Sequence, residues 1–255
     1  MNSDSRKCSL FIPVQKLITV TYFIFFLIGN PFVSKGQQNM PAVASQEIWP
    51  EVDAFYKINP GIRLMALASA TKTNTYYEDG DFGINADFFI LSHFRKEGPE
   101  IDLDSTRGYY QWFRGGLKFT RPDPSAKNTD GQFTIRTESN TRLYPGWKTM
   151  VTIRNRFDFV DKTEMVSVKY MPRVTWEKNF KTEYLNFDAF LYAEYYLYFK
   201  DETNNRFSVA SGFNVKVSRL ILTQLYYLHQ FEHQEKVGTL DAFGIKLIFY
   251  MPLKK

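Results

Sequence analysis

The sequence predicts an all-β fold, a single antiparallel transmembrane β-barrel of about 12 strands, with 10 as the alternative, behind a cleaved signal peptide. Three observations predict it. Apolar and polar residues alternate in segment after segment from Phe133 to Tyr250, an export signal precedes them, and 17% of the residues are aromatic although mean hydropathy is only −0.34. Successive side chains of a strand point to opposite faces, so each alternating segment has one apolar and one polar face.

Residues 1–36 have the features of a secretory signal peptide. Two lysines precede an apolar run at 17–28, and small residues follow the run, which places the cut after Gly36. A retained membrane anchor is the alternative, but a spanning helix needs about 20 apolar residues. The only cysteine, Cys8, lies in this segment. The mature chain would therefore carry no disulfide and no thiolate metal site.

Residues 37–255 are predicted to form one barrel domain. Four basic residues and one acid leave with the signal, which lowers the net charge from +5 to about +2. The basic balance therefore belongs largely to the signal and does not indicate a nucleic-acid partner. We expect no cofactor and no metal. We expect the outer membrane of a Gram-negative bacterium as the location, and outer-membrane lipids, the barrel-assembly machinery and small polar solutes as partners.

Alternation and turn chemistry predict strands along the whole mature chain. They are placed at 47–58, 62–73, 81–92, 109–121, 132–144, 148–161, 165–178, 183–199, 204–218, 219–233 and 240–251. Tight turns are expected at 59–61, 145–146, 179–182 and 218–219. Long polar loops are expected at 73–80, 93–108, 121–131 and 200–205. Short turns on one side are typical of outer-membrane barrels, which have an even strand number, so a further strand is expected at 37–45 or 100–106.

The polar residues of each strand are predicted to face the barrel interior. In 151–159, for example, Ile153 and Phe157 face outward while Arg154 and Arg156 face inward. An arginine or lysine facing lipid near the midplane would cost about 2–4 kcal/mol, which favours this orientation. The predicted interior network comprises Arg136, Glu138, Arg142, Arg154, Arg156, Asp158, Lys169, Arg173, Glu177, Asp188, Glu194, Arg206 and Lys216. It either fills a narrow lumen and fixes strand register, or lines a water-filled passage or ligand cavity.

Five short motifs stand out in order and spacing. They lie at 49–61 (WPEVDAFYKINPG), 155–159 (NRFDF), 170–177 (YMPRVTWE), 193–194 (AE) and 205–207 (NRF). Together they resemble a family of bacterial outer-membrane β-barrel proteins catalogued only as a domain of unknown function. The resemblance runs from about Trp49 to the end of the chain, and it implies a barrel without any established activity. Two departures are Met171-Pro172, where a second basic residue is common, and the non-aromatic C-terminal residue.

The histidines offer the one alternative chemistry. His229 and His233 are four residues apart on one strand face, where they could act as a hydrolase base or a metal pair. No nucleophile motif accompanies them, and an interfacial pair of solvated histidines is the structural alternative. We therefore predict no catalytic residues and a structural or narrow-pore role. The alternatives are an outer-membrane lipid-modifying enzyme that uses His229 or His233, and a soluble exported β-barrel that binds a small apolar ligand.

Overall fold

The computed structural model describes residues 45–73, 76–91, 108–122, 131–162, 165–183, 185–199, 205–232 and 239–251. Within these residues the chain forms eleven β-strands. They are β1 (Ser45–Asn59), β2 (Ile62–Thr73), β3 (Tyr76–Leu91), β4 (Gln111–Pro122), β5 (Gln132–Gly146), β6 (Thr149–Lys162), β7 (Met165–Lys181), β8 (Asn186–Tyr198), β9 (Arg206–Lys216), β10 (Ile221–Glu232) and β11 (Thr239–Met251). None of the described segments is a helix long and apolar enough to cross a membrane.

The chain divides into two compact units. The barrel unit holds Ala42–Lys181 and Asn186–Lys255, and the other holds Met1–Pro41 and Thr182–Leu185. In the second unit the structure describes only a turn. The Thr182 backbone N–H donates to the Leu185 carbonyl oxygen at 2.8 Å, and the Leu185 N–H donates to Thr182 Oγ1 at 3.0 Å. The predicted signal peptide lies outside the described residues.

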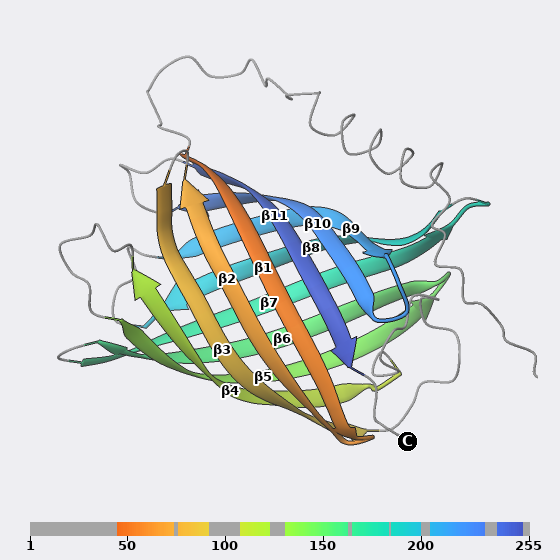
Figure 1. The fold of residues 1–255 in the computed structure, drawn as a ribbon, viewed down its shortest axis with the longest axis horizontal. Coiled ribbons are helices and arrows are strands. Elements are labelled where there is room, and N and C mark those ends of the chain that lie inside the picture. The colour runs from red at the N-terminus through yellow and green to blue at the C-terminus, as the bar shows by residue number, and fades with distance from the viewer. Residues whose placement is uncertain are drawn as a thin grey trace, which may run out of the picture. The chain divides into compact units, whose positions relative to one another are not determined.

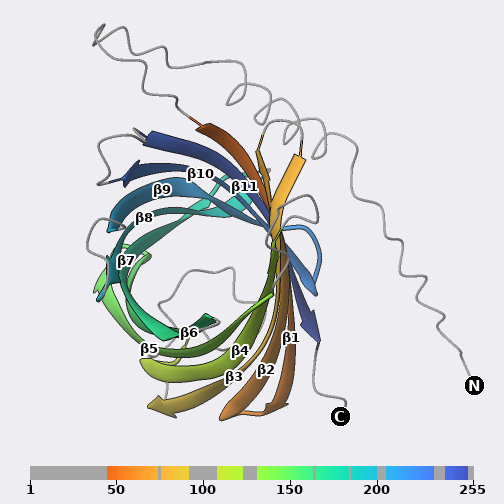
Figure 2. The same cartoon turned by 90° about the vertical axis from the view of Figure 1, so that its left-hand side faces the viewer.

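The strands of the barrel unit close into a single ring (Figure 2). Each strand pairs antiparallel with the next one in the sequence, from β1 to β11. The first and last strands then pair parallel, with residues 45–56 in register with residues 240–251. In Figure 1, β1 accordingly lies between β2 and β11. We call the parallel β1–β11 pair the seam.

The predicted all-β closed barrel is confirmed, but the predicted strand number is wrong. The described residues form eleven strands, not twelve or ten. The prediction assumed that all neighbours are antiparallel, which requires an even number. With an odd number the first and last strands run in the same direction, and a parallel pair closes the sheet. Apart from Ser45, which begins β1, the two segments considered for a twelfth strand lie outside the described residues.

The seam makes a prediction that separates eleven strands from twelve. Val52 of β1 and Leu247 of β11 are exposed register partners, so their Cα atoms lie within the roughly 4.4–6.8 Å that a disulfide needs. We expect Val52→Cys with Leu247→Cys to oxidise to a disulfide, read as loss of both thiols by mass spectrometry. In the control Val52→Cys with Thr223→Cys, the β10 residue in register with Leu247 is two strands away, about 10 Å, and should stay reduced. A disulfide in the control alone would contradict the seam.

The predicted strand positions are confirmed to within a few residues, whereas three of the predicted connections are wrong. β7 continues to Lys181, through most of the turn predicted at 179–182. β3 begins at Tyr76, inside the loop predicted at 73–80, because Tyr76 and Tyr77 continue the ladder with β2. The turn between β5 and β6 consists of Trp147 and Lys148 rather than Pro145-Gly146. Both turn residues have positive φ, 54° and 58°, in the left-handed region that two-residue hairpin turns use.

The expected separation of short turns from long loops is also wrong at one connection. Because the strands alternate in direction, the connections after β1, β3, β5, β7 and β9 share one end of the barrel. Four of them are short and lie at or next to the predicted tight turns. The connection after β3 spans the predicted 93–108 loop, so one long connection shares their end. Tyr109, which follows it, donates its hydroxyl to the Pro60 carbonyl oxygen at 2.6 Å.

The two faces of the sheet differ in burial and polarity. On one face, which we call the exposed face, every strand contributes large apolar side chains. They include Val52, Leu64, Phe82, Ile84, Leu117, Ile135, Phe157, Val174, Leu191, Phe207, Tyr227, Phe243 and Ile245. The alternate residues form the buried face, which holds many charged and polar side chains. They include Asp53, Arg63, Asn85, Asp87, Glu138, Asn140, Asp158, Glu177, Asp188, Glu194, Asn214 and Gln230.

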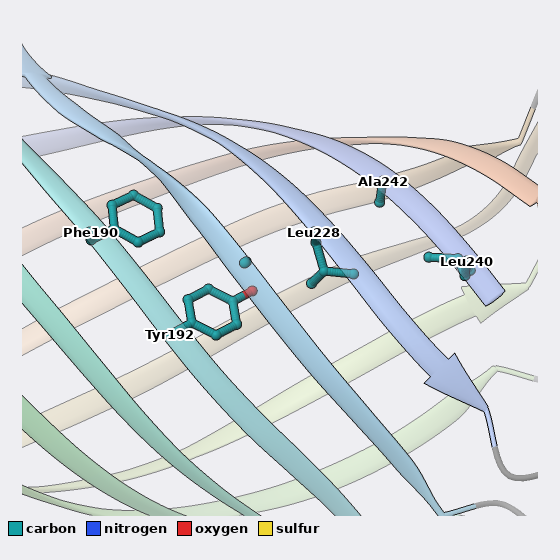
Figure 3. Packing of buried hydrophobic residues seen from close by; sticks show 6 residues of the cluster. Phe190, Tyr192, Leu228, Leu240 and Ala242 are labelled. Carbon is teal, nitrogen blue, oxygen red and sulfur yellow. The ribbon is translucent and has the colours of Figure 1, made fainter. Parts of the chain in front are cut away.

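Part of the buried face is apolar. Phe190 and Tyr192 of β8 pack with Leu228 of β10 and with Leu240 and Ala242 of β11 (Figure 3). A second apolar cluster joins β1, β2, β10 and β11. The buried charges, by contrast, gather mainly on β2 to β8 and at the seam. The buried face therefore has an apolar sector and a charged sector.

Gly116 lets two charged-sector strands approach each other. A Cβ atom at this position would lie 2.1 Å from Asn85 Oδ1 and 2.6 Å from the Ile84 carbonyl oxygen, whereas at Gly115 it would meet nothing within 4 Å. Glycine is thus required at Gly116, but not at Gly115, by a close approach of the neighbouring strand.

Candidate functional site

The charged sector contains a row of alternating charges across five neighbouring strands. Arg63, Asp87, Arg114, Glu138 and Arg156 are successive register partners on β2 to β6. Asp87 accepts from the first two arginines, at 2.5 Å from Arg63 Nη2 and 2.6 Å from Arg114 Nε. Arg114 Nη1 also lies 4.0 Å from Glu138 Oε1. Opposite charges directly across a strand pair stabilise the sheet and its register.

A second cluster surrounds Glu194 on β8. Its carboxylate accepts from Arg154 of β6, and from Arg173 Nη2 of β7 at 2.6 Å. Tyr196 donates its hydroxyl to the same group at 2.8 Å. The Arg173 guanidinium also stacks 3.9 Å above the Tyr192 ring. The Glu194 side chain is only 1% exposed, so this buried carboxylate holds two arginines from two other strands.

Asp158 on β6 is likewise shared by two arginines. Its carboxylate lies 3.1 Å from Arg136 Nε on β5 and 3.2 Å from Arg156 Nη2 on its own strand. Since Arg154 and Arg156 are alternate residues on one face of β6, the two clusters share this strand. We call Arg136, Arg154, Arg156 and Arg173 the arginine wall. Its four cations share two carboxylates.

The opposite stoichiometry occurs at the seam. Lys246 of β11 contacts two carboxylates of β1, with Nζ 2.8 Å from Glu51 Oε1 and 2.5 Å from Asp53 Oδ2. We call Glu51 and Asp53 the acid pair. Phe55 and Tyr250 stack across the same seam, with ring centroids 5.3 Å apart. One lysine is therefore paired with two carboxylates at the seam.

The structure places the predicted network residues at alternate positions of β5 to β9. Glu138, Asp158, Glu177, Asp188 and Glu194 are buried. Arg136, Arg142, Arg154, Arg156, Lys169, Arg173 and Arg206 are half-buried. Lys216 is exposed at the end of β9, away from the clusters described above.

The remaining predicted residues make smaller contacts. Asn179 donates to Asp188 at 2.8 Å, and Asn214 donates to Glu177 at 3.4 Å. Arg142 stacks 4.1 Å above the Trp112 ring.

The sequence prediction missed the charged residues of the first and last strands. These are Glu51, Asp53, Arg63, Asp81, Asp87, Arg114, Lys118 and Lys246. The same period-two alternation marks them, but the predicted network covers only residues between Arg136 and Lys216. Extending the alternation to β1 to β4 and β11 would have placed all eight on the polar face.

The predicted histidine site lies on the exposed face. His229 Nδ1 is 2.7 Å from Asp241 Oδ1 on β11, and Tyr227 donates its hydroxyl to the same oxygen. The edge of the imidazole packs against Phe231, with ring centroids 4.5 Å apart. His233 lies outside the described residues, so the predicted His229–His233 pair is not described. The carboxylate orients the ring through Nδ1, as in a catalytic triad. Tyr227 contacts that carboxylate and not the imidazole Nε2, which is the nitrogen that a triad nucleophile uses.

Known proteins add no assignment to this geometry. Comparison with family models, with curated proteins and with solved structures finds no match to this chain.

Proposed function

We propose that this chain is an integral outer-membrane β-barrel whose polar interior forms a narrow aqueous passage for small solutes. Its place in an uncharacterised family of outer-membrane barrels, on the motif resemblance, is part of the same proposal. The observation that carries the proposal is the polarity of the sheet. Large apolar side chains are exposed on every strand, while charged side chains are buried on the other face.

This polarity is the reverse of that of a water-soluble barrel. Soluble proteins rarely expose contiguous apolar patches larger than a few hundred Å², whereas here the exposed apolar residues continue around a closed ring. A closed sheet has one concave face, and side chains there are shielded by the opposite wall. A lipid bilayer would cover the outer face and leave the charged rows in the interior.

The exposure of the charged residues favours a passage over a solid plug. Side chains of Arg154, Arg156 and Arg173 keep 16%, 18% and 24% of their surface accessible, and Glu51 keeps 25%. The carboxylates behind them, Glu194 and Asp53, keep only 1%. The charged groups that reach furthest into the interior are therefore accessible to water, while their buried partners hold them against the sheet.

The proposal is tested with purified mature protein. We expect the unheated protein to migrate differently from the boiled protein in a detergent gel, to require detergent for solubility, and to produce conductance steps in a planar lipid bilayer. The boiled protein at the same concentration is the control. A protein that is freely soluble without detergent would exclude the membrane assignment. Insertion into a bilayer that stays sealed would exclude the passage and leave a structural barrel.

The alternative of a soluble barrel with an apolar ligand needs the apolar face inside. The large apolar side chains instead lie on the exposed face, which removes the support for that function.

The alternative of a lipid-modifying enzyme keeps one supporting observation, the His229–Asp241 hydrogen bond. It would orient the imidazole for proton transfer at the lipid-facing surface. An unchanged membrane lipid profile in a His229→Ala strain, compared with the wild type, would exclude it.

A further inference from the structure

The charged clusters lie on opposite walls of the ring. The arginine wall occupies β5 to β7, and the acid pair lies on β1. In a closed ring of eleven strands, β6 and β7 are each five steps from β1, in the two directions. Figure 1 shows β6 and β7 crossing behind β1, and Figure 2 shows β1 and β7 on opposite sides of the ring.

The two walls carry opposite excess charge. The arginine wall has four cations and two shared carboxylates, so two positive charges are not matched there by an ion-paired acid. The acid pair has one cation, Lys246, and therefore one excess negative charge. Along β2 to β5, Arg63, Asp87, Arg114 and Glu138 balance one another. The excess positive charge and the excess negative charge therefore face each other across the barrel, at right angles to its axis.

The walls are at comparable depth. Glu51 and Arg173 lie within range of each other's electrostatic field. Both Glu51 and Arg173 also keep about a quarter of their side chains accessible, 25% and 24%. A solute between them would meet ammonium-binding carboxylates on one side and carboxylate-binding guanidinium groups on the other.

We infer that the interior favours small zwitterionic solutes, with the anionic end toward the arginine wall and the cationic end toward the acid pair. This inference rests on the proposed passage. Charges of opposite sign on facing low-dielectric walls focus the field between them and orient a dipole there. An uncharged solute of equal size gains nothing from that field. A simple anion is attracted by one wall and repelled by the other.

The test compares two isomers, glycine as the zwitterion and glycolamide as the uncharged solute, in the osmotic swelling of liposomes that contain the purified barrel. We expect glycine to enter the wild-type liposomes about three times faster than glycolamide. Glu51→Gln removes the single excess negative charge and should bring the ratio close to one. Arg156→Gln leaves one excess positive charge on the arginine wall and should lower the ratio part of the way. Both variants spare the fold, because Lys246 retains Asp53, and Asp158 retains Arg136.

Asp81→Asn is the matched control. Asp81 is 23% exposed and pairs with Lys118 at 2.9 Å, much as Glu51 pairs with Lys246, but this pair joins β3 and β4 and belongs neither to the arginine wall nor to the acid pair. This variant should keep the wild-type ratio. Equal entry of both isomers in the wild type, or an unchanged ratio in both folded wall variants, would overturn the inference while the passage stands. Absence of swelling with either isomer would overturn the passage and the inference together.

Discussion

Replacement of Glu194 by glutamine should destabilise the barrel by about 3–5 kcal/mol, because it leaves two arginines without their shared buried carboxylate. Arg154 and Arg173 come from different strands and both end on this group. Glutamine has nearly the same shape, so packing changes little and the lost charge is the cause. The measurement is urea unfolding in detergent micelles, followed by tryptophan fluorescence and by the gel shift of the folded form.

Asp161→Asn is the control for this experiment, since it makes the same chemical change at an exposed site of β6. Surface substitutions of this kind usually stay within about 0.5 kcal/mol. A Glu194→Gln variant as stable as the control would mean that the arginines find other acceptors, and that the carboxylate does not hold the charged sector together.

Period-two alternation was enough to predict most of the strands. Predicted residues 62–73 coincide with β2, and predicted residues 165–178 fall within β7. Alternation predicts these strands well because each strand has one apolar, exposed face and one more polar, buried face, so the pattern continues along its whole length. Turn chemistry was less reliable. Trp147 and Lys148 adopt left-handed angles that neither residue type favours, so nothing in their identity indicated the turn.

The closure of the barrel could not be predicted from local pattern. Hairpins join neighbours in the chain, and their turns are visible in the sequence, but the seam joins the two ends of the domain. Glu51 and Lys246 are 195 positions apart. Alternation fixes which face each occupies and does not fix which strand lies beside which. The strand number was therefore predicted from the general rule that such barrels have an even number of strands, and that prediction was wrong.

The same limit applies to the charged sector. Alternation correctly separated Glu194 and Arg173 from the exposed face, and it indicated that cross-strand pairing was available. It did not show that two arginines share each of two carboxylates. That arrangement depends on the register of four strands, β5 to β8, which is set by the whole sheet. The clustering of charge in the arginine wall and in the acid pair could therefore not be predicted from the sequence.

Replacement of Lys246 by methionine should have a comparable effect, about 3–5 kcal/mol, at the seam. Methionine keeps most of the aliphatic length but leaves Glu51 and Asp53 without their shared cation, one of them 1% exposed. Parallel pairing is slightly less stable per residue than antiparallel pairing, so the seam has less reserve than any hairpin. Unfolding in urea should begin earlier, and the Val52→Cys and Leu247→Cys disulfide should restore much of the loss.

Lys118→Met separates the seam from an ordinary ion pair. Lys118 has a similar exposure, 20% against 18%, and one partner, Asp81, on the adjacent antiparallel strand. Partly exposed pairs of this kind contribute about 0–1 kcal/mol, so this variant should remain near the wild type. The triple variant Lys246→Met, Glu51→Gln, Asp53→Asn should recover stability, because no buried charge is left unpaired. Suppose that Lys246→Met and Lys118→Met lowered the free energy of unfolding by equally small amounts. Closure of the barrel would then depend on the backbone ladder and the Phe55–Tyr250 stack, and the acid pair would have a role in the passage only.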